Sequence, residues 1–172
     1  MAEAADLYYE VHGAEDAPPL ILSSGLGGSA NYWAPNIPAL AEQYRVIAYD
    51  HRGTGRSDRA LPDTVRVEDF AADILALMDA LEIPVATVIG HAAGGVAALA
   101  LALLAPQRID KLVVVSDDDM LVPSNAGVAL ANGLPIAGFC RAEHGGHAVN
   151  VVDPDAFNSF VLAWLAGEIA EG

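Results

Sequence analysis

The sequence predicts a three-layer α/β fold in which helices cover both faces of a mostly parallel central sheet. Two observations carry this prediction. Short apolar, β-branched runs alternate along the chain with segments of helical periodicity, and most of the apolar runs have no polar face. Strands that are apolar on both faces are typical of a parallel sheet buried between helices. A length of 172 residues fits one domain spanning residues 1–172.

The expected strands and helices alternate along the chain. The strands cover residues 6–13, 18–24, 44–50, 86–90 and 111–116, with a weaker strand at 136–142. The helices cover residues 65–81, 94–106, 124–133 and 155–170. The first helix has apolar residues about every 3.6 positions, which indicates one buried face, whereas the second is apolar nearly all round and is expected in the core. Such alternation predicts a sheet with helical crossovers.

The composition argues against several classes of function. Eight Lys and Arg residues stand against 23 Asp and Glu residues, for a formal net charge of −15. A charge of this sign repels phosphate backbones and anionic headgroups, so we expect no nucleic acid and no membrane as partner. No apolar run approaches the roughly 18 residues of a membrane span, and no secretory leader is recognisable, so a cytoplasmic location is expected. The single Cys140 fits a reducing compartment and excludes a multi-cysteine metal site.

Five loops follow predicted strands and should carry the chemistry. They are 24-SGLGGSANYW-33, 50-DHRGTGRSD-58, 90-GHAAGG-95, 116-SDDDMLVP-123 and 143-EHGGHAVNVVDP-154. Ligands of parallel α/β sheets bind beyond the carboxyl ends of the strands, where such loops meet. Glycines in the first loop allow backbone N–H groups to turn toward an oxygen atom. A glycine-rich turn, an acid and a histidine are therefore expected at one edge of the sheet.

The order and spacing of these motifs resemble those of the α/β-hydrolase superfamily over nearly the whole chain. The motifs are LYYEVHG, SGLGGS, YRVIAYDHRGTGRS, GHxxGG, DMLVP and GGHxxN. Within the superfamily, an elbow without serine together with GGHAVNVVDP is most similar to the hydrolases of carbamate or aminoacrylate in pyrimidine (uracil) catabolism. The resemblance implies an α/β-hydrolase core that acts on a small-molecule carbonyl substrate, with no cofactor and no metal ion.

Carried over position by position, the resemblance assigns roles to individual residues. Ala92 occupies the position of the nucleophile, Asp119 that of the acid and His147 that of the base. The backbone N–H groups of Leu26 and Ala93 would form the oxyanion hole. Residues expected to contact substrate are Gly25, Trp33 and His91.

Several assignments leave alternatives open. Asp117 and Asp118 compete with Asp119, which is favoured because the superfamily's acid usually stands four residues before the proline. His144 is the lesser candidate for the base. Packing is weighed above catalysis for His91, and Trp33 either lines a pocket or fills the core.

Nucleotide binding is the rival function that the sequence pattern suggests. The glycines of the 24–33 loop follow a strand and Asp50 ends the next one, which imitates the dinucleotide fingerprint. A Rossmann unit needs a helix that begins at those glycines, but Pro35 and Pro38 delay it. Nucleotide binding is therefore disfavoured.

Two departures from the superfamily pattern shape the expected chemistry. The first is alanine at position 92, whose methyl group cannot attack a carbonyl carbon, so an acyl-enzyme on residue 92 is excluded. What remains is a His147–Asp119 pair that is able to take a proton from water. The alternative is a catalytically inactive pseudo-hydrolase, or an engineered scaffold, that binds a small carbonyl ligand.

The second departure is an apparent deletion. Superfamily members continue from the strand at 112–116 into a helical lid and another strand, whereas here the aspartates follow directly, so the lid is expected to be deleted. An open site would expose its apolar residues and favour a homodimer through the uncovered face. The residues expected at that face are Leu26, Trp33, Met120 and Val149.

Overall fold

A computed structural model describes residues 7–115, 137–140 and 146–168, and these build around one six-stranded sheet in the order β1-β3-β2-β4-β5-β6. The strands are β1 (Tyr9–His12), β2 (Pro19–Ser23), β3 (Arg45–Tyr49), β4 (Ala86–Gly90), β5 (Ile109–Val115) and β6 (Ala137–Cys140). The edge strand β1 pairs antiparallel with β3, and every other pairing is parallel. The predicted α/β class with a mostly parallel sheet is confirmed.

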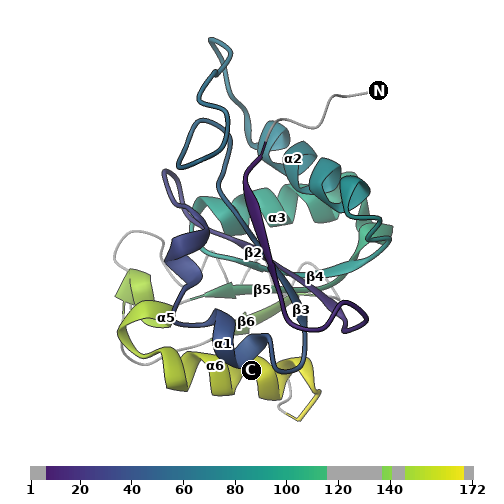
Figure 1. The fold of residues 1–172 in the computed structure, drawn as a ribbon, viewed down its shortest axis with the longest axis vertical. Coiled ribbons are helices and arrows are strands. Elements are labelled where there is room, and N and C mark those ends of the chain that lie inside the picture. Colours follow the sequence, from purple (N-terminus) through teal and green to yellow (C-terminus); the bar gives the residue numbers. More distant parts are fainter. Residues whose placement is uncertain (1–6, 116–136, 141–145, 169–172) are drawn as a thin grey trace.

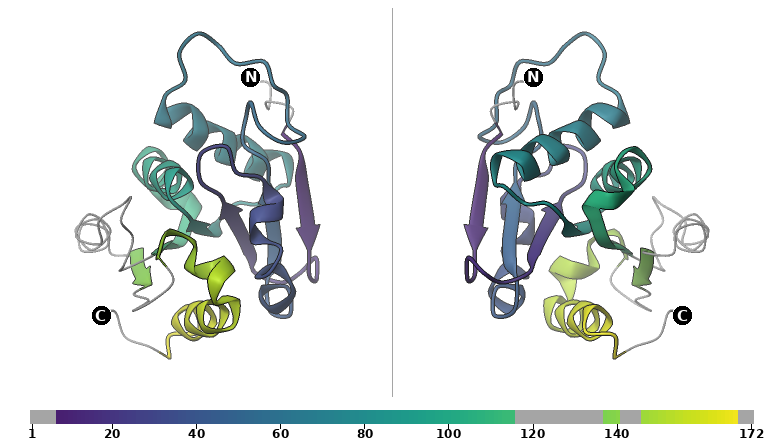
Figure 2. Two further views of the ribbon diagram at one scale, coloured as in Figure 1. Left: turned by 90° about the vertical axis from the view of Figure 1, so that its left-hand side faces the viewer. Right: turned by 90° about the vertical axis from the view of Figure 1, so that its right-hand side faces the viewer.

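Helices cover the two faces of this sheet (Figures 1 and 2). One face carries α2 (Val67–Ala80) and α3 (Ala93–Leu104), and the other carries α1 (Ile37–Leu40) and α6 (Pro154–Leu165). The short α5 (Val149–Val152) leads into α6. Three 3-10 helices complete the described elements: η1 (Ala30–Trp33), η2 (Pro106–Arg108) and η3 (Gly146–Ala148).

Side-chain alternation along the strands divides the core into two layers. Residues one apart on a strand point to opposite faces, so Ile21 packs toward α2 and α3 while Leu20 and Leu22 pack toward α6. The layer under α2 and α3 includes Ile47, Ile74, Met78, Val88 and Leu101. The layer under α6 includes Trp33, Val46, Ile89, Phe157 and Val161. The central strands are thus buried on both faces, which explains their continuous hydrophobicity.

The two helices of the first face differ as their sequences do. Helix α2 buries one side and exposes the other, as its periodicity predicts. The inner face of α3 is made of small residues such as Gly94, Ala97 and Ala98, which let the helix approach the sheet closely. Its outer face is exposed, with Leu103 at 72%. The expectation that α3 is core all round is therefore wrong for the outer face.

Other differences from the expected elements are small. The predicted strands and the helices matching α2, α3 and α6 lie within a few residues of their expected bounds. Helix α1 is absent from the expected elements. Pro38 lies in its first turn, where no intrahelical N–H bond is lost. The expected helix at 124–133 lies outside the described residues. No helix in the described ranges is long and apolar enough to cross a membrane.

Candidate active site

The turn that joins β4 to α3 has the strained backbone of a nucleophile elbow. Ala92 has φ +50° and ψ −120°, a conformation rare for a residue with a side chain. A Cβ on Gly94 would lie 2.2 Å from the backbone oxygen of Ser23, and one on Gly90 would lie 2.4 Å from the Cα of Gly95. Glycine is therefore required at positions 90 and 94. Backbone strain of this kind concentrates at functional sites.

The glycine-rich loop after β2 lies against this elbow. A Cβ on Gly25 would come within 3.1 Å of Nδ1 of His91 and 3.3 Å of the Cβ of Ala92. The start of the loop is held by His51, whose Nε2–H donates to the backbone oxygen of Ser24 over 2.7 Å. Because Gly25 touches the elbow, the backbone that follows it runs beside the site.

The two N–H groups expected to form the oxyanion hole come from these neighbouring segments. Ala93 is the first residue of α3, and an N–H in the first turn of a helix has no intrahelical acceptor. Leu26 directly follows Gly25, and its side chain is 82% exposed. Their role in holding an oxyanion stays a prediction.

His147 reaches the elbow from the C-terminal part of the chain. It lies in η3 and is half-buried. Its ring centroid is 4.4 Å from that of His91, and its backbone oxygen accepts a hydrogen bond from Nε2 of His91. The structure thus brings His147 beside the residue that precedes Ala92. Its role as a base stays a prediction.

A buried amide cluster fixes the segment that follows His147. The hydroxyl of Tyr32 donates to Oδ1 of Asn150 over 2.8 Å, and Nδ2 of Asn36 donates to the backbone oxygen of Asn150 over 2.9 Å. Asn36 also donates to Oδ1 of Asn158 over 3.0 Å. The sequence interpretation gave no role to Asn36 or Asn158, because nothing local to either residue signals a contact more than a hundred residues away.

Two residues expected at an open, apolar face are buried. Trp33 is 0% and Val149 3% exposed, and both pack in the core layer under α6, where Trp33 contacts Phe157 with ring centroids 6.3 Å apart. The expectation that Trp33 and Val149 face water is therefore wrong, because they fill the space between η1 and α6. Trp33 serves the core, which was one of its two predicted roles. Leu26 is exposed as expected.

Several predicted site residues lie outside the described residues. They are Asp117, Asp118, Asp119, Met120 and His144. The choice of acid, and any contact between Asp119 and His147, stay predictions.

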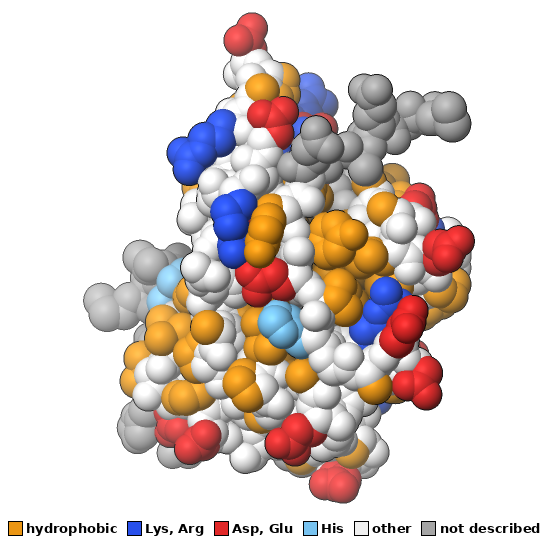
Figure 3. Space-filling model, viewed as in Figure 1, with side chains coloured by type: hydrophobic (Ala, Val, Ile, Leu, Met, Phe, Trp, Pro, Cys, Tyr) orange, Lys and Arg blue, Asp and Glu red, His pale blue; other side chains and the backbone are white. Residues whose placement is uncertain are grey.

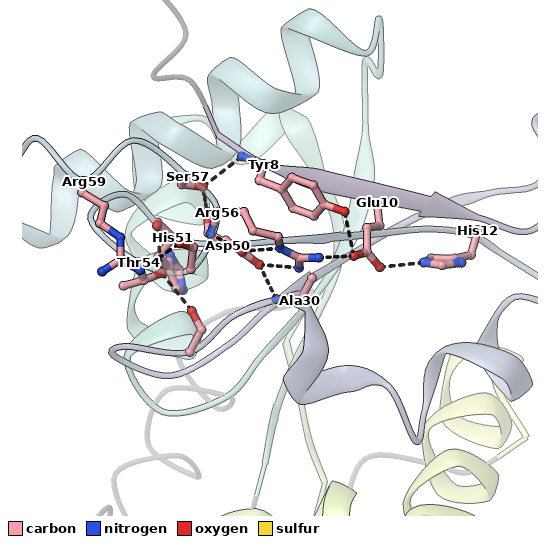
Figure 4. A network of polar contacts seen from close by, with 12 residues as sticks. Tyr8, Glu10, His12, Ala30, Asp50, His51, Thr54, Arg56, Ser57 and Arg59 are labelled. Atoms are coloured by element: carbon pink, nitrogen blue, oxygen red, sulfur yellow. Dashed lines mark hydrogen bonds and ion pairs between the residues drawn. The ribbon is translucent and has the colours of Figure 1, made fainter.

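A second polar cluster is centred on Asp50, at the start of the loop that follows β3 (Figure 4). The buried carboxylate of Asp50 accepts hydrogen bonds from the N–H of Ala30 over 2.8 Å and from the N–H and guanidinium of Arg56 over 2.8–3.0 Å. Arg56 also pairs with Glu10 over 2.8 Å. Burial alone would raise the pKa of Asp50, but these hydrogen bonds outweigh it and the pKa lies below its ordinary value.

These contacts give Asp50 a structural role. Its carboxylate is occupied by donors of the protein itself, so it does not offer the free acceptor that a nucleotide ribose would need.

On the face seen in Figure 3, charged side chains of both signs intersperse with apolar ones. Within the described part of the chain, no group of three His, Cys, Asp or Glu side chains is arranged to hold a metal ion.

Comparisons with known proteins agree with the fold. A family model described as the alpha/beta hydrolase fold matches residues 18–132. A protein of Caulobacter sp. (strain K31) named "Putative carbamate hydrolase RutD" is 35% identical over 260 residues, which covers 95% of this chain and 97% of that protein. The RutD of Caulobacter segnis is 58% identical over 111 residues, which covers 63% of this chain and 42% of that protein.

Solved structures resemble the fold as a whole. An enol-lactonase from Burkholderia xenovorans LB400 has a TM-score of 0.85 at 21% identity, over 93% of this chain and 96% of that one. A hydrolase from Pseudomonas aeruginosa PA01 also has a TM-score of 0.85, at 23% identity, over 92% of this chain and 94% of that one.

The alignment with the strain K31 protein is longer than the 172 residues of this chain, so that protein carries sequence with no counterpart here.

Proposed function

This chain belongs to the α/β-hydrolase family, and from that premise we propose that it hydrolyses a small carbamate or amide-like compound with water and without a covalent intermediate. The observation that carries the proposal is the strained elbow at Ala92, which is kept although the residue has no nucleophile. A strained backbone conformation persists only where the surrounding structure enforces it, and such residues cluster at active sites. The predicted relationship to RutD is confirmed, and the carbamate hydrolase named in those relatives supports the class of substrate.

In the proposed reaction, a water molecule beside Ala92 adds to the carbonyl carbon while His147 takes one of its protons. Histidine suits this role because its ordinary pKa lies near 6.5, close to neutral pH. The oxygen of the former carbonyl becomes an oxyanion, which the N–H groups of Leu26 and Ala93 stabilise. The carbon–nitrogen bond then breaks, and His147 returns the proton to the leaving nitrogen.

The elbow retains most of what such a reaction needs. Hydrogen-bond donors aimed at a developing oxyanion are often the largest single contribution to catalysis, worth about 10²–10³ in rate for one donor. Proteases stripped of a triad member keep about 10³–10⁴ over the uncatalysed rate. A carbamate decomposes readily unaided, so acceleration of that order suffices for turnover. We expect Gly25 and His91, which lie beside Ala92, to contact the substrate.

Three further features belong to this proposal. Asp119 orients and stabilises His147, as the resemblance implies. The sequence missing relative to the strain K31 protein includes the lid, which leaves an accessible site and favours association of two copies at this face. The substrate derives from pyrimidine catabolism in the cytoplasm.

Decomposition of freshly dissolved carbamate, followed by ¹³C NMR, tests the proposal against an inactive, carbonyl-binding pseudo-hydrolase. The parent protein should accelerate decomposition, and His147→Ala should remove that acceleration. His12→Ala is the matched control, because His12 lies on the edge strand β1 and pairs with Glu10. A parent that gives the rate of buffer alone would favour the inactive binder.

A further inference from the structure

Position 92, where serine hydrolases carry their nucleophile, lacks a hydroxyl group and with it a specific hydrogen bond. In serine hydrolases the base is hydrogen-bonded to the nucleophile's hydroxyl, which helps to place the imidazole at the reacting carbon. The methyl group of Ala92 neither donates nor accepts a hydrogen bond. A histidine that activates water at this elbow must be placed by other contacts.

The neighbouring side chain makes a contact of the required kind. His91 is 6% exposed, and its ring centroid lies 4.7 Å from that of Tyr32 and 4.4 Å from that of His147. Its Nε2 is hydrogen-bonded to the backbone oxygen of His147. Because a carbonyl oxygen only accepts, Nε2 of His91 carries the proton. The donor therefore stands one residue from Ala92 and its acceptor belongs to the residue that bears the base.

The packing around His91 keeps this donor in place. Gly25 leaves room for the ring, since a Cβ there would lie 3.1 Å from Nδ1 of His91. On the other side, the ring of Tyr32 covers His91 while its hydroxyl holds Asn150, three residues beyond His147. The segment 147–150 is thus tied at both ends to residues that surround the elbow.

We propose that His91 is a positioning residue, which holds His147 at the elbow through its Nε2–H in place of the absent serine hydroxyl. This inference rests on the proposed function and deepens it, because it assigns the placement of the base to residue 91 instead of residue 92. A side chain at position 91 must then place a hydrogen-bond donor where Nε2 of His91 meets the backbone oxygen of His147. An aromatic ring without such a donor does not hold His147 in place.

Two variants separate the donor from the packing. His91→Phe keeps an aromatic ring but removes the donor, whereas His91→Gln supplies an N–H at a similar reach without a ring. Amide hydrogen exchange of residues 147–150 should rise about tenfold in His91→Phe, as expected for the loss of one net hydrogen bond. His91→Gln should recover most of this protection and of the carbamate hydrolysis that His91→Phe loses. Val96→Ala, on the exposed side of α3, is the control.

The exchange measurement needs no turnover, so the two proposals can fail separately. Faster amide exchange in His91→Phe, in a protein that does not hydrolyse carbamate, would support the positioning role of His91. The same result would overturn the proposed hydrolysis. A folded His91→Phe that exchanges like the parent, or a His91→Gln that behaves like His91→Phe, would overturn the positioning role. Where His91→Phe does not fold, ¹⁵N spectra of the parent imidazoles decide. An Nε2–H tautomer with a slowly exchanging proton supports the proposal, and an Nδ1–H tautomer overturns it.

Discussion

Gly94 lies directly against the backbone of Ser23, so close that a Cβ at position 94 would be 2.2 Å from the Ser23 oxygen. This contact joins the first turn of α3 to the end of β2, where the glycine-rich loop begins. The contact therefore fixes how closely the elbow approaches the start of the loop that contains Leu26. The geometry of the site depends on the absence of a side chain at this point.

Gly94→Ala should be destabilising. The added methyl group meets backbone atoms that cannot rotate away, and overpacking of this kind costs about 1–3 kcal/mol. The free energy of unfolding, measured in urea, should fall by that amount. Val96→Ala on the exposed side of the same helix should change it by less than about 0.5 kcal/mol. Equal stability of Gly94→Ala and the parent would mean that this contact does not constrain the elbow.

His51 should make stability depend on pH in the neutral range. Burial lowers the pKa of His51, although its hydrogen bond to Ser24 and the charges of Asp73 and Asp50 act in the opposite direction. In the unfolded chain a histidine titrates near 6.5, so below about that pH the unfolded state binds more protons than the folded state. The stability that a neutral His51 allows is therefore complete above about pH 6.5 and is lost as the pH falls.

His51→Gln tests this dependence, because glutamine keeps a donor toward Ser24 but does not titrate. The slope of unfolding free energy against pH between about 5 and 7, the range of histidine titration, should be shallower in His51→Gln than in the parent. His12→Gln, on the edge strand, serves as control. Parallel curves for the parent and His51→Gln would contradict a buried, neutral His51.

Carbamate hydrolysis should slow at low pH. A base takes a proton from water only in its unprotonated form, so the rate above background should fall as the pH drops where His147 is the base. His147→Ala should be slow and independent of pH across about 5 to 8, where histidine is the side chain that ordinarily titrates. The measurement is the rate in each protein minus that of buffer at the same pH. A pH dependence that survives in His147→Ala would assign the base elsewhere.

Much of the fold follows from local patterns in the sequence. Strands β2, β3 and β4 are predicted within about a residue because burial on both faces makes them continuously apolar. Helix α2 is equally clear from its periodicity. Helices α1 and α5 span four residues each, too few to display a helical period. The exposed face of α3 is not evident from its sequence, because a helix that is apolar on all sides has no polar stripe to mark the side that faces solvent.

The site was predictable in its components but not in its connections. The elbow glycines and His147 stand in recognisable motifs, whereas the hydrogen bonds from His91 to His147 and from Tyr32 to Asn150 join residues 56 and 118 positions apart. No local pattern encodes such pairs. Trp33 illustrates the same limit, since a tryptophan after a glycine-rich loop suits a pocket wall or a core, and only the packing against Phe157 distinguishes them.

Stopped-flow kinetics of Ala92→Ser on a short-chain nitrophenyl ester determines whether the hydrolase elbow is intact here and lacks only its nucleophile. The strained backbone at residue 92 would present a serine hydroxyl beside the oxyanion donors and His147. We predict a rapid burst of nitrophenol, stoichiometric with enzyme, in Ala92→Ser and none in the parent. The additional change His147→Ala should remove the burst. A folded Ala92→Ser that releases nitrophenol no faster than the parent would show that the elbow does not support a nucleophile.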